Sequence, residues 1–299
     1  MREGKSETAT AAARPEAAGF VLAGGQSSRM GQDKALLLFA GRPLVAHALS
    51  ILRQAGLPVS IAGARPSART SLGAFAPVVE DAEPGLGPLS GICAALASTS
   101  ARYAVFLPVD LPLLPPSLIG YLLHHARITG RAVTVPTVAG FDQTFPVVLD
   151  RALLPALKAA LSQNQSSCRP NPQPPSRRDQ QGAATLHEIG KGYTNSGFAV
   201  ERSPGNSGFL PRKKPLRGRK TGGIRPDSVV GARSVGCLSA FQAAAASIGQ
   251  PISRVAVELL AQSGQVTHPL GLPPVRWFLN LNTPGDVEQA EALSRSRIA

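Results

Sequence analysis

Aromatic residues and cysteines are scarce in this sequence of 299 residues. Aromatics make up 5% of it, and its three cysteines are Cys93, Cys168 and Cys237. Three widely separated cysteines cannot form a disulfide framework, and no two of them have the spacing of zinc ligands. We therefore expect reduced thiols, as in a cytoplasmic protein.

Long hydrophobic runs are also missing. No window approaches the roughly 18 uninterrupted apolar residues of a membrane-spanning helix. Residues 1–18 carry charges but lack the apolar stretch of a secretory signal. These absences exclude a helical membrane protein, and we expect residues 1–18 to form a disordered leader on a cytoplasmic protein that has no membrane partner.

Acidic residues are few, since 18 Asp and Glu stand against 31 Lys and Arg, a formal net charge of +13. Most of the excess lies in residues 163–236, which hold thirteen Lys and Arg against four Asp and Glu. This segment is rich in Pro, Gly, Ser and Gln, so it cannot bury enough apolar surface to offset the entropy lost on ordering. We predict a basic low-complexity insertion at 163–236 and one domain formed by residues 19–162 and 237–299.

Short apolar runs alternate with amphipathic stretches from Gly19 onward. The runs expected to form strands are GFVLAGG, which begins at Gly19, and the segments 58–65, 76–81, 102–114, 131–138 and 145–150. The stretches between them have the spacing of helices, as do CLSAFQAAAASIG and ISRVAVELLAQSG nearer the end of the chain. This alternation predicts an α/β fold with three layers, in which a mostly parallel sheet carries helices on both faces.

The stretch LAGGQSSRMGQDKALL, residues 22–37, follows the first predicted strand. Gly24 and Gly25 lack side chains, so the backbone N–H groups of this loop can approach phosphate oxygens closely. Arg29 can form paired hydrogen bonds with phosphates, and Lys34 can place a mobile positive charge over them. The P-loop pattern G-x-x-x-x-G-K-[ST] is absent, which excludes that kind of phosphate site. The alternative interpretation is a tight turn with two surface cations.

Two carboxylates follow predicted strands. Asp110 comes directly after the apolar run VFLPV, and Asp81 ends the segment APVVED. In open α/β sheets ligands bind at the carboxyl ends of the strands, so both carboxylates and the glycine loop should meet at one edge. Asp110 suits Mg²⁺, which prefers one or two carboxylate oxygens together with phosphate and water. The alternative is that both aspartates cap the turns that follow them.

Two asparagines lie in the segment WFLNLNTPGD near the end of the chain. We predict a strand, a turn and a terminal helix here, which places Asn280 and Asn282 on the same face of the strand. Amides among apolar residues need hydrogen-bond partners. The pair therefore indicates either a polar contact within a site or two amides that stabilise the turn before Thr283.

Four segments resemble the molybdenum cofactor guanylyltransferases, within residues 19–161 and 238–293. They are LAGGQSSRMGQDKALL, VVEDAEPGLGPLSGICAAL, FLPVDLPLL and WFLNLNTPGDVEQAEAL. The resemblance implies a Rossmann-like fold of the nucleotide-diphospho-sugar transferase type. It also implies transfer of GMP from GTP to the phosphate of Mo-molybdopterin by direct in-line attack, with release of pyrophosphate.

The same resemblance implies roles for individual residues. Arg29, Lys34 and Asp110 would be catalytic, and Asp110 would also hold Mg²⁺. Asn280 and Asn282 would lie on the acceptor side. The residues implied in nucleotide binding are Leu22, Ala23, Gly24, Gly25, Lys34, Asp81 and Asp110.

Two other functions stay open at this point. The glycine loop suits phosphate and ribose better than a particular base, so a related nucleotidyltransferase that uses CTP or another triphosphate is the first alternative. The second is a nucleic-acid-binding protein that acts through the basic insertion, although three aromatics in that insertion offer little for base stacking. The partners implied by the resemblance are GTP, Mo-molybdopterin and, transiently, molybdopterin-carrying or molybdoenzyme-maturation proteins.

Overall fold

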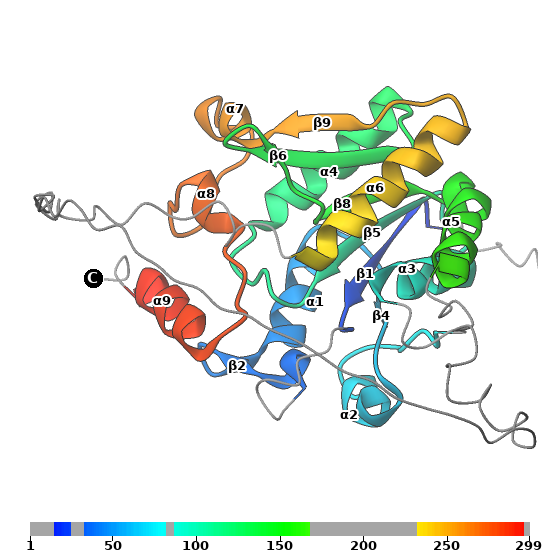
Figure 1. Ribbon diagram of the computed structural model, residues 1–299. Coiled ribbons are helices and arrows are strands. Elements are labelled where there is room, and N and C mark those ends of the chain that lie inside the picture. The colour runs from blue at the N-terminus through cyan, green and yellow to red at the C-terminus, as the bar shows by residue number, and fades with distance from the viewer. Residues whose placement is uncertain (1–14, 25–32, 82–86, 168–231, 296–299) are drawn as a thin grey trace, which may run out of the picture. The chain divides into compact units, whose positions relative to one another are not determined.

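A sheet of seven strands runs through the part of the chain that the computed structural model describes, residues 15–24, 33–81, 87–167 and 232–295 (Figure 1). The strand order is β4, β1, β5, β8, β6 and β7, and β9 pairs with the other edge of β6. The strands are β1 (Ala17–Leu22), β4 (Val59–Ala62), β5 (Tyr103–Pro108), β6 (Val133–Val138), β7 (Phe141–Asp142), β8 (Val147–Asp150) and β9 (Ser253–Ala256).

Five of these strands run in one direction. β1 is parallel to both β4 and β5, and β9 is parallel to β6. β8 lies antiparallel between β5 and β6, so β5 and β6 share a direction, and β7 is also antiparallel to β6. The predicted α/β class with a mostly parallel sheet is confirmed, with β8 and β7 as the exceptions.

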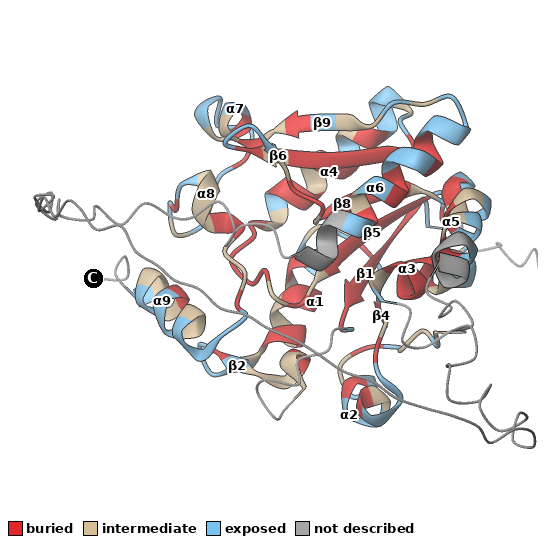
Figure 2. Ribbon diagram, in the orientation of Figure 1, coloured by how far each residue is buried: buried red, intermediate tan, exposed pale blue. Residues whose placement is uncertain are grey.

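Helices cover both faces of the sheet. Successive side chains of β1 and β5 point to opposite faces, and because they are apolar on both, each face must be buried. Val21, Val105 and Leu107 belong to one hydrophobic core, whereas Phe20 and Phe106 belong to the other. Buried residues run along these strands (Figure 2). The first core includes residues of α1 (Leu44–Gln54), α2 (Arg69–Gly73), α4 (Pro116–Thr129), α7 (Val257–Gln262), α8 (Pro274–Trp277) and α9 (Pro284–Arg295). The second includes residues of α3 (Pro88–Ser98), α5 (Leu154–Ser167) and α6 (Ala232–Ser247).

Short elements connect these layers. The first loop leads into the 3-10 helix η1 (Lys34–Leu36) and then into a hairpin of β2 (Leu38–Phe39) and β3 (Arg42–Pro43). Ala40 and Gly41, at the hairpin turn, both have positive φ angles, of 47° and 74°. Two further 3-10 turns are η2 (Pro66–Ala68) and η3 (Arg151–Leu153).

Three predicted elements differ from the structure. Residues 76–81 form only a single bridge, between Ile61 and Val78, because Pro77 has no N–H group to extend a ladder. The strand predicted around Trp277, near the end of the chain, does not form. Pro273 and Pro274 start the short helix α8 instead, and an irregular stretch follows it. The helix predicted over ISRVAVELLAQSG begins instead as strand β9, whose Val255 is buried against β6.

The predicted boundaries of leader and insertion also shift. β1 begins at Ala17, so residues 17 and 18 belong to the sheet rather than to a leader. α5 continues to Ser167 and α6 begins at Ala232, so both helices extend into the range predicted for the insertion. Residues 1–14 and 168–231, which hold most of the predicted leader and insertion, lie outside the described residues.

Two of the three cysteines can be placed. Cys93 and Cys237 are buried in the second core and form no disulfide within the described residues, and burial raises the pKa of the Cys237 thiol to about 11. Cys168 lies outside the described residues. Among the helices that the structure describes, none is both long enough and apolar enough to cross a membrane.

Candidate active site

The carboxyl ends of β4, β1 and β5 meet at one edge of the sheet. The N–H of Val109 donates to the carbonyl of Leu22 (3.2 Å), and that of Ala23 donates to the carbonyl of Ala62 (3.0 Å). The side chains of Leu22 and Ala23 are buried, so these residues contribute backbone groups rather than side chains to this edge of the sheet. Gly24 follows directly, while Gly25 and Arg29 lie outside the described residues.

Three glycines allow a close approach of β1, β4 and α3 at this edge. A Cβ atom on Gly24 would lie 2.3 Å from the carbonyl oxygen of Gly63, and one on Gly91 would lie 2.8 Å from the Cα of Gly63. Gly63 itself has a φ of +70°, a conformation that side chains rarely adopt. Of these three glycines the sequence predicted a role only for Gly24. Gly63 follows a strand and Gly91 lies within a helix, and a lone glycine at such positions can signal a close backbone contact.

Lys34 and Asp110 form an ion pair at the same edge. Lys34 Nζ donates to Asp110 Oδ2 at 2.9 Å and to Asn282 Oδ1 at 2.6 Å. Lys34 is the first residue of η1, whose N-cap Asp33 accepts a hydrogen bond from the N–H of Ala35. The side chains of Lys34 and Asp110 are 17% and 22% exposed. These two charges are therefore partly shielded from water. Their attraction is stronger than that of an ion pair on an open surface, because the effective dielectric constant is lower.

The second oxygen of Asp110 has no partner among the described residues. Asp110 Oδ1 is buried and accepts no hydrogen bond from them. A buried carboxylate oxygen that stays unpaired costs free energy, so a ligand that satisfies it is favoured here. A hard divalent cation that also binds phosphate and water fits this oxygen, because such ions need only one or two protein carboxylates. Within the described residues there is no group of three His, Cys, Asp or Glu side chains that could bind a metal by themselves.

Asp81 lies beside the glycine contact rather than beside Lys34. Asp81 Oδ1 accepts a hydrogen bond from the hydroxyl of Ser90, a buried residue in the first turn of α3. Ser90 precedes Gly91, which packs on Gly63 after β4. Asp81 is thus at the β4 side of the edge and Asp110 at the β5 side, with the end of β1 between them. Ser90 was not identified from the sequence, because a single serine in a helix gives no signal.

The two asparagines occupy different environments. Asn282 is exposed and its side chain contacts Lys34, whereas Asn280 is half-buried. The prediction that both lie on one face of a strand is wrong, because residues 279–282 have no regular structure. This stretch is instead held to the site by a hydrogen bond from the N–H of Leu281 to the carbonyl of Asp110 (3.0 Å).

A half-buried histidine supports the loop after Asp110. His268 Nε2 lies 2.8 Å from the carbonyl of Leu113, and His268 Nδ1 accepts a hydrogen bond from the N–H of Leu270 (3.0 Å). These two contacts require the neutral ring with its proton on Nε2. Burial lowers the pKa of His268 from its ordinary value of 6.5. The indole of Trp277 stacks on the ring at 5.9 Å between centroids.

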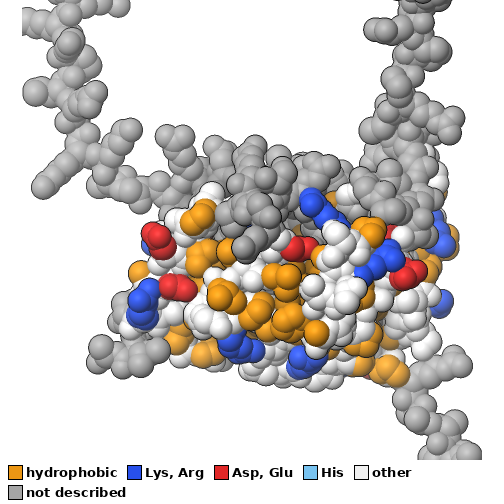
Figure 3. Space-filling view, turned by 90° about the horizontal axis from the view of Figure 1, so that it is seen from below, with side chains coloured by type: hydrophobic (Ala, Val, Ile, Leu, Met, Phe, Trp, Pro, Cys, Tyr) orange, Lys and Arg blue, Asp and Glu red, His pale blue; other side chains and the backbone are white. Residues whose placement is uncertain are grey.

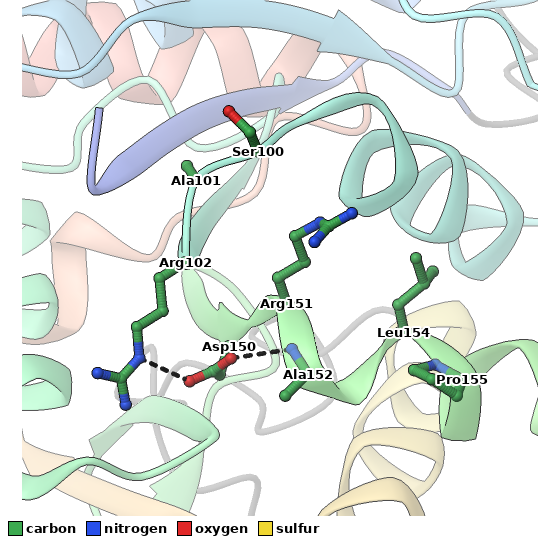
Figure 4. Close-up of a pocket in the computed structure, with 8 residues that line it drawn as sticks. All are labelled: Ser100, Ala101, Arg102, Asp150, Arg151, Ala152, Leu154 and Pro155. Atoms are coloured by element: carbon green, nitrogen blue, oxygen red, sulfur yellow. Dashed lines mark hydrogen bonds and ion pairs between the residues drawn. The ribbon is translucent and has the colours of Figure 1, made fainter. Parts of the chain in front are cut away.

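A surface hollow elsewhere contributes nothing to this site. It lies at the start of β5, the opposite end of the strand from Asp110, and its lining includes Arg102, Asp150 and Arg151 (Figure 4). Arg102 Nε donates to Asp150 Oδ2 at 3.1 Å, and Asp150 Oδ1 accepts from the N–H of Ala152. Arg102 and Asp150 are thus paired with each other, Asp150 also caps η3, and Arg151 Nε donates to the carbonyl of Leu96 at 3.3 Å.

One face of the molecule bears on the nucleic-acid alternative. A view from below shows hydrophobic side chains gathered in the middle of the face, with acidic and basic side chains interspersed around them (Figure 3). The described side chains on this face do not form the continuous basic patch that is typical of nucleic-acid binding. The basic insertion, on which that alternative depends, is outside the described residues.

Comparison with known sequences places these features in a family context. A family model described as MobA-like NTP transferase domain matches residues 19–170. A molybdenum cofactor guanylyltransferase of Xanthomonas euvesicatoria pv. vesicatoria is 40% identical over 153 residues, which span 50% of this chain and 73% of that protein. One of the same name from Pseudomonas putida is 35% identical over 158 residues, 52% of this chain and 81% of that protein.

A solved structure has a similar fold. Molybdopterin-guanine dinucleotide biosynthesis protein A from Archaeoglobus fulgidus superposes with a TM-score of 0.56 at 16% identity, covering 93% of this chain and 98% of that one. At that identity the likeness concerns the fold. It agrees with a Rossmann-like sheet whose carboxyl edge carries Lys34 and Asp110.

Proposed function

The chain belongs to the MobA-like NTP transferase family, and we propose that it transfers GMP from GTP to the phosphate of Mo-molybdopterin. The products are the guanine dinucleotide form of the molybdenum cofactor and pyrophosphate. The relatives named molybdenum cofactor guanylyltransferase support the choice of reaction. The observation that carries it is the convergence of Lys34, Asp110 and Asn282 at the carboxyl edge of the sheet, where α/β folds bind their ligands.

The chemistry is a direct displacement at the α-phosphorus of GTP. A phosphate oxygen of the acceptor forms the new bond to that phosphorus, and the bond from phosphorus to the bridging oxygen of the β-phosphate breaks. The electron pair of the broken bond leaves with pyrophosphate. A phosphate nucleophile is already ionised near neutral pH, so the reaction needs no side chain as general base. Positioning and charge neutralisation therefore supply most of the rate enhancement.

Lys34 and Asp110 have complementary roles in this scheme. Lys34 exchanges part of its contact with Asp110 for the triphosphate oxygens, because an ammonium group on a flexible stem can donate to both. Arg29, by the motif resemblance, adds a second positive charge from the same loop. Asp110 Oδ1, which is buried without a partner among the described residues, is the oxygen proposed to hold a divalent ion, specifically Mg²⁺. When bound, this ion would neutralise charge on the phosphate oxygens.

The remaining residues are proposed to hold the two substrates. The backbone of Leu22, Ala23, Gly24 and Gly25 would line the nucleotide, with Asp81 on the β4 side near its base or ribose. Asn280 and Asn282 would lie toward the acceptor phosphate. We also propose that the enzyme acts in the cytoplasm and contacts molybdopterin-carrying or molybdoenzyme-maturation proteins transiently.

A comparison of nucleotides tests the proposal. Pyrophosphate release is measured with Mo-molybdopterin and GTP, CTP or ATP in turn, and the product is identified by mass. We expect GTP to be used at least about tenfold faster than CTP, with a guanine dinucleotide as product. Faster release with CTP would replace the proposed reaction by transfer of CMP. The absence of release with every nucleotide would contradict nucleotidyl transfer to this acceptor.

A further inference from the structure

The N-terminus of α9 carries reciprocal hydrogen bonds that reach into the site. Asp286 Oδ2 accepts from the N–H of Thr283 at 2.8 Å and from the N–H of Asn282 at 2.9 Å. In return, Thr283 Oγ1 accepts from the N–H of Asp286 at 3.2 Å. A capping box of this kind satisfies N–H groups that a helix end leaves unpaired. Here the carboxylate also accepts from the N–H of Asn282, which precedes the cap and whose side chain contacts Lys34.

The backbone of Asn282 is thereby fixed from two sides. On one side the N–H of Leu281 donates to the carbonyl of Asp110, and on the other the carboxylate of Asp286 holds the N–H of Asn282 itself. Because Asn282 is exposed and lies outside regular structure, packing alone does not fix its side chain. The two hydrogen bonds set the position from which Asn282 Oδ1 reaches Lys34 Nζ.

A second contact ties α9 to the segment that carries Lys34. Glu291 Oε1 accepts from the N–H of Ala40 at 3.0 Å, in the hairpin that follows η1. Glu291 Oε2 is itself paired with Arg295 one turn later, at 3.1 Å. α9 therefore holds both the asparagine that contacts Lys34 and the hairpin that follows Lys34 in the chain.

We propose that Asp286 is a positioning residue for the transfer reaction, acting through Asn282 on the ammonium group of Lys34. This inference rests on the proposed function for its kinetic consequence, but the chain of contacts from Asp286 to Lys34 does not depend on it. The competing account is that Asp286 only caps α9 and contributes to stability. The two accounts differ in what happens at Lys34 when the cap is weakened in different ways.

Two variants separate these accounts. Asp286→Ala removes the acceptor of the Asn282 N–H, whereas Thr283→Ala removes the reciprocal half of the cap and leaves that N–H bound. Both should lower the melting temperature. Only Asp286→Ala should lower kcat/KM for GTP, by about 10- to 100-fold, the usual range for residues that orient a site from behind. Asp286→Asn keeps an acceptor oxygen and should recover most of the activity.

A double mutant tests the route. In the Asn282→Ala background, Asp286→Ala should change kcat/KM by less than about threefold, because the residue it acts through is already gone. Equal losses of kcat/KM in Asp286→Ala and Thr283→Ala would overturn the proposal. Independent, multiplying effects of Asp286→Ala and Asn282→Ala would also overturn it.

The chemical reactivity of Lys34 tests the link from Asp286 without depending on nucleotidyl transfer. The rate at which a water-soluble N-hydroxysuccinimide ester acylates Lys34 is measured by peptide mass spectrometry, with Lys158 as internal reference. Asp286→Ala should raise this rate at least about threefold, since Lys34 loses a held partner, and Thr283→Ala should not. An unchanged rate in Asp286→Ala would overturn the positioning role. If the rate rises but the wild-type protein forms no dinucleotide, the proposed function fails while the link from Asp286 to Lys34 stands.

Discussion

Lys34 Nζ and Asp110 Oδ2 lie 2.9 Å apart although 76 residues separate them in the chain. β1 and β5 are neighbours in the sheet, and the two residues follow the carboxyl ends of these strands. The fold thus places a cation and an anion together where an α/β sheet binds ligands. A triphosphate and a divalent cation can each take one partner of this pair, which makes the pair the centre of the proposed site.

Asp110→Asn should abolish most of the activity and leave the fold intact. The amide keeps the shape of the side chain and one acceptor for Lys34, but it loses the charge that a divalent cation requires. We expect kcat to fall by about 10²-fold to 10³-fold, the usual cost of removing one electrostatic group from a transition-state site. The matched control is Asp142→Asn, which breaks a surface ion pair with Arg254. Equal activity of Asp110→Asn and this control would contradict the role of Asp110.

Arginine should not replace Lys34 in the proposed site, so the variant Lys34→Arg should lose activity. A guanidinium keeps the positive charge, but its planar group cannot contact Asp110 and Asn282 with the geometry of a single ammonium. We expect kcat/KM for GTP to fall at least about tenfold, as for other misplaced charged groups. Steady-state kinetics with varied GTP measure this. Wild-type kinetics in Lys34→Arg would show that charge alone suffices.

The glycine contact predicts opposite effects of alanine in two helices. Gly91→Ala places a Cβ 2.8 Å from the backbone of Gly63, so the unfolding free energy should fall by about 1–3 kcal/mol. Gly120→Ala in α4 meets nothing within 4 Å and should raise it by about 0.5–1 kcal/mol. Urea unfolding of both variants measures the difference. A Gly91→Ala protein as stable as wild type would contradict the close approach of α3 and β4.

Stability should decrease as the pH falls below about 6.5, the ordinary pKa of histidine. Burial lowers the pKa of His268 in the folded state, so between that lowered value and 6.5 the unfolded chain binds more protons. The contribution of neutral His268 is therefore complete above pH 6.5 and is lost on acidification. Protonation of Nδ1 would also break the hydrogen bond from the N–H of Leu270, because two donors would then face each other.

Urea unfolding at pH 7.5 and 5.5 measures this effect. The loss of stability between the two pH values should be smaller in His268→Gln than in wild type. A residual loss should stay, because burial also lowers the pKa of His47 and of His125. An identical pH dependence in the variant and in wild type would contradict a neutral His268 whose pKa is lowered by partial burial.

The sequence predicted the elements whose signals are local. Apolar runs marked β1, β5 and β6, and the glycine loop and the aspartate after β5 indicated where a ligand would bind. The rule that strand ends share an edge was enough to predict that Lys34 and Asp110 meet. The parts that failed depend on contacts between distant segments. The stretch after Trp277 looks like a strand because it is apolar, but it is buried by packing against the first core without a ladder.

Long-range contacts also explain the residues that sequence reasoning missed. Gly63 and Gly91 matter because their backbones touch; a lone glycine can signal a close contact, but the sequence does not say which backbone approaches it. The hydrogen bond from the N–H of Asn282 to Asp286 is local, and its link to the site follows only from the long-range contact of the Asn282 side chain with Lys34.

Thermal stabilisation by GTP with and without Mg²⁺ tests the central claim most directly, in wild type and in Asp110→Asn. A ligand at about 100 times its dissociation constant stabilises the folded state by about 2.7 kcal/mol, which a melting curve resolves. In wild type, GTP with Mg²⁺ should raise the melting temperature more than GTP alone, and in Asp110→Asn the addition of Mg²⁺ should give no further rise. An equal Mg²⁺-dependent rise in both proteins would show that the ion binds elsewhere, and the account of this site would be wrong.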